Sequence, residues 1–310
     1  MSRLYERIST AIMEGEPEKT AQLVQKCLDQ GLNPKEILDN AMIVGMGEVG
    51  VRFKAGDMFV PEVLMSADSM QAGLVVLRPH LVAGGVKLMV DFHNRWNPAM
   101  WGIKEKVVAG ELGDPQMLTV RLNDTIYVPT EMLSWGGRST VIWFLGSHAV
   151  DLVRWLFDDE VARVYSVSRS RVLKGMGVDT PDFFLTIVEL EGGGVAHIEN
   201  CWIMSTSMPT VFDFKLEMIG SEGTCFADCS SHRMLQTFTP AGPSYPDVAV
   251  RTEVQGVPGG FGINSIRHFA DCVIHDREPA IGVADGLENT RVLVAIHESA
   301  RSGQPVEVQR

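Results

Sequence analysis

His148 is the residue of this sequence best suited to acid–base chemistry. A neutral imidazole ionises close to neutral pH, so it can exchange a proton with a hydroxyl group. Asp151 follows one helical turn later and is spaced to orient the ring if residues 141–157 form a helix. We predict a catalytic role for His148, and a buried helical histidine without chemistry is the alternative.

A second candidate group combines polar and aromatic residues at predicted strand ends and in the long loop before residue 141. These residues are Arg95, Asn97, Asn123, Tyr127 and Trp135. Directional hydrogen-bond donors next to aromatic faces suit a small polyol such as a sugar. Together with Asp151 they form the predicted substrate-binding set, and ordinary surface-loop structure is the alternative.

The run Gly45-Met46-Gly47-Glu48-Val49-Gly50 matches the dinucleotide fingerprint G-x-G-x-x-G. That pattern binds a pyrophosphate when a strand precedes it and a helix follows, with an acidic residue about 20 positions later. Asp68 lies near that distance, but residues 33–44 have helical periodicity and no βαβ unit follows. We therefore interpret this run as a glycine-loosened helix end and not as a nucleotide site.

Two patterns resemble metal sites, and we predict no metal at either. Asp91-Phe92-His93 begins like the Asp-x-His-x-x-Gly loop that ligates cobalt, but its sixth position is Trp96. We expect His93 to be a structural residue at a strand end. Cys225, Cys229 and His232 lack the spacing of a four-ligand zinc site, so the two thiols are predicted to lie in the core of a sheet.

Residues 1–82 have helical periodicity. Apolar stripes predict helices over 8–13, 17–28, 33–44 and 61–79, the third starting with Asn33 as N-cap and Pro34 at its first position. Four helices with short connections form an antiparallel bundle. The sequence therefore predicts a helical unit of its own.

Residues 83–310 have mixed character. They contain a predicted strand at 86–90, helices at 98–110 and 141–157, and six strands between 161 and 239 after one at 117–122. Two helices follow at 263–275 and 285–301, the latter with Asp285 as N-cap and Gly303 as stop. The fold class is therefore α+β, with an N-terminal four-helix bundle and an open, largely antiparallel sheet domain that carries helices on one face.

Composition excludes several classes of protein. The 310 residues are 45% hydrophobic and 21% charged, which is typical of a folded globular chain, and the net charge of −12 argues against nucleic acid or an anionic membrane as partner. Five scattered cysteines do not form a disulfide framework, and the N-terminus has no signal peptide. We expect a cytoplasmic protein.

Four ordered segments carry a family resemblance: KLMVDFHNRWNP at 87–98, AGELGDP at 109–115, GSHAVDL at 146–152 and ESARSGQPV at 298–306. Residues from about 86 to 310 resemble the C-terminal domain of the Gfo/Idh/MocA oxidoreductases, which are sugar and cyclitol dehydrogenases with nicotinamide cofactors. The resemblance implies that His148 works beside an aspartate four residues earlier, where this chain has Phe144. It also implies a preceding Rossmann domain with a Glu-Lys-Pro signature, and this chain lacks both.

Residues before Val86 resemble something else. The runs GEVGVRF at 47–53 and GDMFVPEVL at 56–64, with Arg78-Pro79, are similar to the helical cap of corrinoid-dependent methyltransferase proteins and methionine synthase. The resemblance implies that Phe59 and Met65, with Met58, cover the upper face of a corrinoid. Packing inside the bundle or against another subunit is the alternative for these side chains.

We therefore expect a Rossmann-less relative of the sugar dehydrogenases that is not a competent NAD(P)-dependent enzyme by itself. It would bind a small sugar or polyol, and any catalysis would use a cofactor supplied by another chain. No cofactor is expected to be bound, with cobalamin as the weaker alternative and NAD(P) excluded. The second hypothesis is a corrinoid-linked methyl-transfer accessory whose bundle caps a cobalamin held by a partner.

The strand segments are apolar on both alternating faces, for example Phe183 to Val188. The predicted helices cover one face, and a contiguous apolar face is larger than soluble monomers usually expose. A two-fold contact of more than about 2,000 Å² would bury the other face. We expect a homo-oligomer, dimer or tetramer, built on that sheet face.

Overall fold

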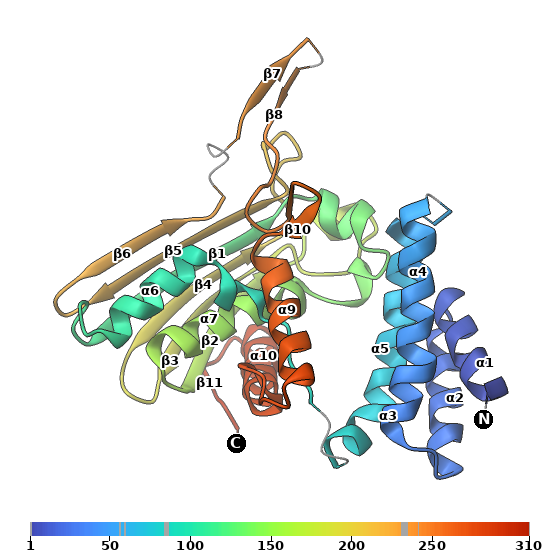
Figure 1. Ribbon diagram of the computed structural model, residues 1–310. Helices are drawn as coiled ribbons and strands as arrows, with labels where there is room; N and C mark the ends of the chain where they lie inside the picture. The colour runs from blue at the N-terminus through green and yellow to red at the C-terminus, as the bar shows by residue number, and fades with distance from the viewer. Residues whose placement is uncertain are drawn as a thin grey trace. The chain divides into compact units, whose positions relative to one another are not determined.

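The computed structural model describes residues 2–55, 57–58, 60–83, 87–230, 235–240 and 242–309. The chain forms two compact units, Met1–Leu88 and Met89–Arg310. Figure 1 shows that the first unit, drawn in blue and cyan, consists of helices, whereas the second carries the sheet. The fold is therefore α+β, as the sequence predicts.

The first unit contains α1 (Ser2–Met13), α2 (Pro17–Asp29), α3 (Pro34–Ile37), the π-helical turn η1 (Leu38–Met42), α4 (Ile43–Ala55) and α5 (Val60–Ala83). Asn33 caps α3 as predicted, because its side chain accepts the Lys35 N–H at 2.8 Å. The predicted apolar stripes are buried: Ile8, Ile12, Val24 and Cys27 have no exposed surface. These side chains form the core of the unit.

Two expected helix ends in this unit are wrong. The helix that starts at Pro34 does not stop near residue 44, because α3, η1 and α4 follow one another without a break up to Ala55. The run Gly45–Gly50 therefore lies inside α4 and is not a loosened helix end. The last helix also passes through Pro79 and ends at Ala83.

The second unit is built on a seven-stranded sheet with the order β11-β2-β3-β4-β1-β5-β6. Its strands are β1 (Pro115–Asp124), β2 (Val161–Arg169), β3 (Phe183–Leu190), β4 (Val195–Cys201), β5 (Phe212–Gly220), β6 (Thr224–Asp228) and β11 (Val306–Glu307). The sheet is mixed, because β1 and β4 run parallel while the other neighbours are antiparallel. The predicted β3–β4 hairpin forms, and Gly193 takes a positive φ of 93° in its turn.

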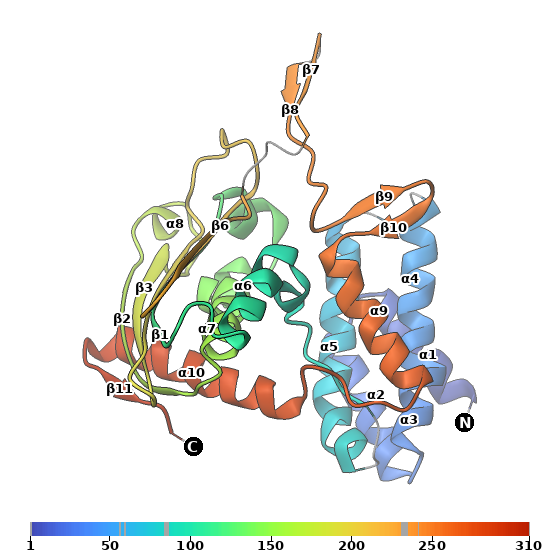
Figure 2. The same ribbon diagram turned by 60° about the vertical axis from the view of Figure 1, so that its left-hand side comes forward.

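Helices pack on one face of this sheet (Figure 2). They are α6 (Pro98–Val108), α7 (Ser147–Phe157), which continues the π-helical turn η5 (Ile142–Gly146), and α10 (Val283–Ser302). Helix α7 contacts β1 and β4, α10 contacts β2, and α6 contacts β6. The core between the two layers includes Trp202 and Phe184, both almost fully buried.

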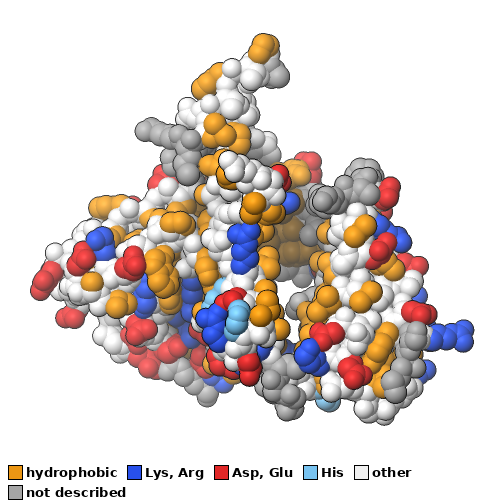
Figure 3. Space-filling view, in the orientation of Figure 1, with side chains coloured by type: hydrophobic (Ala, Val, Ile, Leu, Met, Phe, Trp, Pro, Cys, Tyr) orange, Lys and Arg blue, Asp and Glu red, His pale blue; other side chains and the backbone are white. Residues whose placement is uncertain are grey.

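The remaining elements are short, apart from α9 (Phe261–Ile274). They are η2 (His93–Trp96), η3 (Val128–Met132), η4 (Gly136–Arg138), α8 (Val172–Gly175), β7 (Thr237–Thr239), β8 (Gly242–Ser244), β9 (Thr252–Val254) and β10 (Val257–Gly259). The strand expected up to residue 239 is represented by β7, which pairs with β8 outside the main sheet, and residues 233 and 234 lie outside the described residues. Acidic and basic side chains are interspersed on the face seen in Figure 3.

Two further expectations for this unit are wrong. Residues 87–90 do not form a strand, because no neighbouring strand pairs with them among the described residues, and the Val90 N–H donates instead to the Ile281 carbonyl. The N-cap of α10 is Gly282 and not Asp285, whose carboxylate accepts the Gly282 N–H at 2.9 Å from the third position of the helix. The predicted stop at Gly303 is confirmed by its left-handed backbone.

Candidate functional site

His148 is the second residue of α7, directly after the π-helical turn η5. Its ring is half-buried, and its Nδ1 atom is inaccessible to solvent and has no hydrogen-bond partner among the described residues. Burial and, to a smaller extent, the neighbouring His93 lower the pKa of His148 to about 4. The imidazole is therefore neutral at pH 7 and keeps one buried nitrogen without a partner.

Aromatic rings surround His148. The His93 ring lies 4.7 Å away at an angle of 54°, and the Phe92 ring approaches edge-on at 6.0 Å. On its other side His93 stacks with Phe261 at 5.8 Å and 28°. His93 is thus enclosed by ring contacts in the second unit, and it lies in the 3-10 helix η2 and not at the strand end expected for it.

Asp91 adds a carboxylate to this group. Its Oδ2 atom lies 3.8 Å from Nδ1 of His93. Partial burial opposes ionisation of Asp91, but interactions with His93 and Ser265 outweigh burial and lower the pKa of Asp91. The negative charge of Asp91 in turn favours protonation of His148, although burial of the ring dominates. The three residues form a row, carboxylate to imidazole to imidazole.

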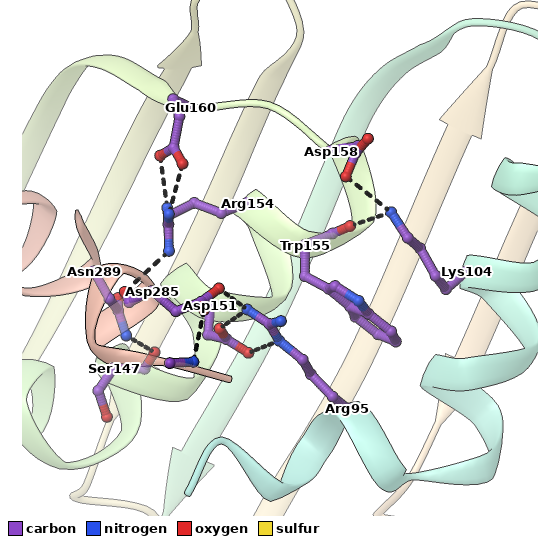
Figure 4. Close-up of polar contacts among 11 residues, drawn as sticks. Arg95, Lys104, Ser147, Asp151, Arg154, Trp155, Asp158, Glu160, Asp285 and Asn289 are labelled. Atoms are coloured by element: carbon purple, nitrogen blue, oxygen red, sulfur yellow. Dashed lines mark hydrogen bonds and ion pairs between the residues drawn. The ribbon is translucent and has the colours of Figure 1, made fainter. Parts of the chain in front are cut away.

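Arg95 and Asp151, both predicted to bind substrate, bind each other (Figure 4). Arg95 Nε donates to Asp151 Oδ2 at 3.0 Å, and Arg95 Nη2 donates to Asp151 Oδ1 at 2.6 Å and to Asp285 Oδ1 at 3.0 Å. Asp151 has no exposed surface. Burial raises the pKa of Asp151 to about 6 while Arg95 opposes the rise, so the pair is ionised at pH 7. Asp151 therefore orients Arg95 and not His148.

Further polar contacts join this pair to neighbouring elements (Figure 4). Arg154 forms two hydrogen bonds with Glu160, at 2.6 and 2.7 Å, and a third with the carbonyl of Asp285 at 3.2 Å. Asn289 of α10 donates to the carbonyl of Ser147 at 2.8 Å, next to His148. The start of α7 is thus tied to α10, which limits the movement of the His148 backbone.

The other predicted substrate residues are spread over several structural roles. Asn97 caps α6 by accepting the Ala99 N–H at 3.0 Å and also contacts Cys229 at 3.4 Å. Asn123 is almost fully buried and bonds Glu199 and the Cys201 N–H, both at 2.7 Å. Such bonds hold neighbouring strands together and leave few groups for a ligand.

Tyr127 and Trp135 are not among the aromatic rings that contact His148 in the described part of the chain. Tyr127 is 40% exposed at the start of η3. Trp135 packs edge-to-face on Phe144, with ring centroids 5.7 Å apart. Phe144, which stands where the resembling family has an aspartate, is therefore part of the core, and His148 has no carboxylate at that position.

A cavity of about 710 Å³ lies between the start of α6 and the start of α9. Its wall includes Asn97, Asp228, Phe261 and Asn264. Phe261 connects it to His93 through their stacked rings. Sequence reasoning missed His93 and Phe261 as site residues. The Asp-x-His pattern of Asp91 and His93 is a local signal for His93, and no local pattern marks Phe261.

The residues expected to cover a corrinoid lie in the first unit. Phe59 lies outside the described residues. Met65 is 45% exposed on α5, and Met58 is buried.

The described residues contain no cluster of three His, Cys, Asp or Glu side chains able to hold a metal ion, and no described helix is long and apolar enough to cross a membrane. All five cysteines are free.

Comparison with known proteins gives two separate matches. Residues 104–308 match the oxidoreductase family C-terminal alpha/beta domain of the Gfo/Idh/MocA proteins, and residues 4–78 match a B12 binding domain. Scyllo-inositol 2-dehydrogenase (NAD(+)) of Bacillus subtilis (strain 168) is 26% identical over 230 residues, which cover 72% of this chain and 63% of that protein. A corrinoid protein of Desulfitobacterium hafniense (strain Y51) is 34% identical over 83 residues, 27% of this chain and 38% of that protein.

Solved structures show the same fold. Scyllo-inositol dehydrogenase from Lactobacillus casei, described with bound NAD(H) and scyllo-inositol, superposes with a TM-score of 0.60 at 14% identity, covering 80% of this chain and 76% of that one. Myo-inositol 2-dehydrogenase from Lactobacillus plantarum gives 0.59 at 17% identity, covering 77% and 69%. The chain spans less than two thirds of the length of the curated relatives above.

These matches correct the expectation about cofactors. We expected none to be bound and NAD(P) to be excluded, and this is wrong, because the first unit matches a B12 binding domain and the second is similar to dehydrogenases named or solved with NAD. The missing Rossmann motifs concern one domain, and they do not exclude a cofactor at the domains that this chain does contain. Since the match over 104–308 covers more than half of the chain, this protein belongs to the Gfo/Idh/MocA oxidoreductase family.

Proposed function

We propose that residues 89–310 bind a cyclitol or sugar and transfer a proton between His148 and one of its hydroxyls during oxidation or reduction. The observation that carries this proposal is the buried Nδ1 atom of His148, which has no partner among the described residues. A buried polar atom without a hydrogen bond is costly, and a ligand hydroxyl would satisfy it. The similarity to scyllo-inositol 2-dehydrogenase supports a cyclitol as the ligand class.

Oxidation of an alcohol removes a hydride from carbon and a proton from oxygen. A nicotinamide cofactor, when bound, supplies the hydride acceptor. The chain's own contribution is the proton site: His148 is neutral at pH 7 because burial lowers its pKa, and only the neutral ring can accept the proton. The bonds from α10 to the start of α7 hold the ring in place. The ligand would enter through the 710 Å³ cavity, whose Phe261 wall adjoins His93.

We further propose that the nucleotide is held by residues outside the described sheet unit, in another chain or domain. The G-x-G-x-x-G run does not fit a pyrophosphate, because it lies within α4, where backbone N–H groups are used by the helix. The first strand after the helical unit is β1, and the described residues before it contain no βαβ unit. These observations support a nucleotide site outside residues 89–310.

The helical unit is proposed to bind a corrinoid. Its match to a B12 binding domain over residues 4–78 supports this, and the exposed Met65 on α5 offers an apolar side chain to the ligand. A cap over a cobalamin held by a partner protein is the alternative function for this unit, and the similarity to corrinoid proteins supports it.

We propose a homo-oligomer built on the open face of the sheet. Apolar side chains of adjacent strands are exposed there by about 40%: Tyr165, Leu185, Ile187, Val195 and Met117. Leu185 and Ile187 alternate with buried Phe184 and Val188 along β3, so they point away from the helices. Burying such a face needs a second surface of the same chemistry, and a two-fold copy supplies one.

Calorimetric titration of the full chain with scyllo-inositol tests the ligand site. We expect saturable binding that His148→Gln weakens, because glutamine offers different hydrogen-bonding geometry and no proton transfer. His197→Gln is the matched control, since His197 lies on β4 away from the helices. Unchanged affinity in the His148 variant would refute the site.

A further inference from the structure

A second cavity in residues 89–310, of about 580 Å³, has walls unlike those of the first. Three of the six tryptophans of the chain line it: Trp96, Trp101 and Trp155. The other lining residues are Arg95, Pro98, His268 and Ala280. His148 is not among them, and Pro98 also lines the 710 Å³ cavity. Its volume lies within the range of small-molecule pockets.

The tryptophans form one aromatic wall rather than a clamp. Trp101 and Trp155 have ring centroids 6.1 Å apart and planes inclined by 31°. Two rings that close and that inclined leave no room for a flat ligand between them, since stacking requires parallel faces on both sides. Trp101 is also 52% exposed, which is unusual for so large an apolar side chain. The wall is suited to a ligand that lies against one side of it.

Polar donors stand at the edge of this wall. Arg95 donates hydrogen bonds from Nε and Nη2 to Asp151 and Asp285. Within the described residues its Nη1 makes no hydrogen bond. Its guanidinium carbon lies 5.8 Å from the centre of the Trp155 ring (Figure 4). The N–H of Ala280 donates to Nε2 of His268, so a neutral His268 carries its proton on Nδ1. The cavity therefore combines aromatic faces with outward-facing donors.

The two cations next to this site are already paired with carboxylates. Arg95 is matched by Asp151 and Asp285, and Lys104, which lies 5.8 Å from the Trp155 ring, is 3.6 Å from Asp158. A cationic ligand would meet Arg95 and Lys104, which already lie near Trp155, and an anionic ligand would have to compete with the carboxylates that hold these two cations. A neutral ring with apolar C–H faces and hydroxyl groups meets neither penalty.

We propose that the cavity lined by Trp96, Trp101 and Trp155 binds a neutral hydroxylated ring, such as a sugar residue, separately from the ligand at His148. The C–H face of the ring lies against Trp101 and Trp155, and its hydroxyls accept hydrogen bonds from Arg95 Nη1. The site does not depend on the proton chemistry proposed above. It would add a second point of attachment for a larger glycoside or a separate glycan.

Titration of the full chain with methyl β-D-glucopyranoside, followed by tryptophan fluorescence, tests the site. We expect a saturable change in the wild-type protein and a loss of affinity of about tenfold or more in Trp101→Ala, because a stacking face is removed. Trp143→Ala is the matched control, since Trp143 is 42% exposed in the same unit but stacks on His297 and does not line the cavity. Circular dichroism establishes that both variants are folded.

Three outcomes would overturn the proposal. The first is no saturable signal in the wild-type protein, and the second is equal affinity in Trp101→Ala and the wild type. The third is tighter binding of adenosine than of the glucoside, which would indicate a site for flat aromatic ligands. The variant His148→Gln separates this site from the other: it should bind the glucoside normally, and loss there with retention in Trp101→Ala would assign the glucoside to the His148 site.

Discussion

Replacing Arg95 with methionine removes the cation that holds a fully buried carboxylate. Arg95 donates two hydrogen bonds to Asp151, which has no exposed surface, and a third to Asp285. Removing one partner of a buried ion pair costs about 3–5 kcal/mol, because the remaining charge is left without compensation. We expect Arg95→Met to lower the free energy of unfolding of residues 89–310 by about 3–5 kcal/mol at pH 7.

The cost should depend on pH in a defined direction. Burial already raises the pKa of Asp151 to about 6, and without Arg95 it rises further. Asp151 of the variant is then neutral when folded and ionised when unfolded at pH 7, a difference that lowers stability by about 1.4 kcal/mol for each pH unit. In the wild type Asp151 is ionised in both states above its folded pKa. The gap between the two proteins should therefore widen by about 1.4 kcal/mol from pH 6.5 to 7.5.

Urea unfolding followed by tryptophan fluorescence measures this cost. All six tryptophans lie in residues 89–310, so the signal reports on this unit alone. Adding Asp151→Asn to Arg95→Met removes the carboxyl group that has lost its partner, and it should restore most of the free energy of unfolding. Lys106→Met is the control, because the Lys106–Glu111 pair is exposed to solvent and should contribute little. A cost below about 1 kcal/mol, or one that does not change with pH, would refute the reasoning.

Three other predictions follow from individual contacts. His148 should titrate with a pKa of about 4 by NMR. Because this pKa lies below the ordinary value, the contribution of the neutral ring to the free energy of unfolding should be lost as pH falls from 6.5 towards 4. A titration near 6.5 would contradict the burial argument. Asp182→Ala should lower the free energy of unfolding in urea by about 2–4 kcal/mol, because the Asp182 carboxylate accepts the N–H groups of Arg171, Val172 and Leu173. Burial opposes ionisation of Asp182, but these bonds outweigh it and lower the pKa, so the stability difference between wild type and variant should disappear as pH falls through that lowered pKa. A stability difference that persists at low pH would show that it is not electrostatic. Ile187→Asp should convert a dimer into a monomer in sedimentation experiments at micromolar concentration, whereas Val294→Asp on α10 should not; a monomeric wild-type protein would rule out the sheet-face contact.

Local structure was largely predictable from the sequence. Helical spacing placed Ile8, Ile12, Val24 and Cys27 on buried faces, because a period near 3.6 brings such residues to one side. The caps at Asn33 and Gly303 were predictable for the same reason: each depends on a few neighbouring residues. Errors arose where an element needed a distant neighbour, as in residues 87–90, which have strand-like composition but no strand beside them.

The candidate site was only partly predictable. The sequence singled out His148, Arg95 and Asp151 by residue type, and all three lie in one region of the second unit. It did not show that Arg95 and Asp151 bind each other across 56 residues, which removes most of their capacity for a ligand. It also missed His93 and Phe261, because their ring contacts join η2, α7 and α9, elements far apart in the chain.

By itself, then, the sequence determined the two units, their α+β character and the identity of the residues able to do chemistry. Only the tertiary structure decided which of those residues meet. It paired Arg95 with Asp151, left Nδ1 of His148 without a hydrogen-bond partner in the part of the chain that the structure describes, and gathered Trp96, Trp101 and Trp155 around one cavity. The physical reason is that periodicity specifies which face of an element is buried, whereas the neighbour that covers this face is chosen by packing between segments distant in the chain.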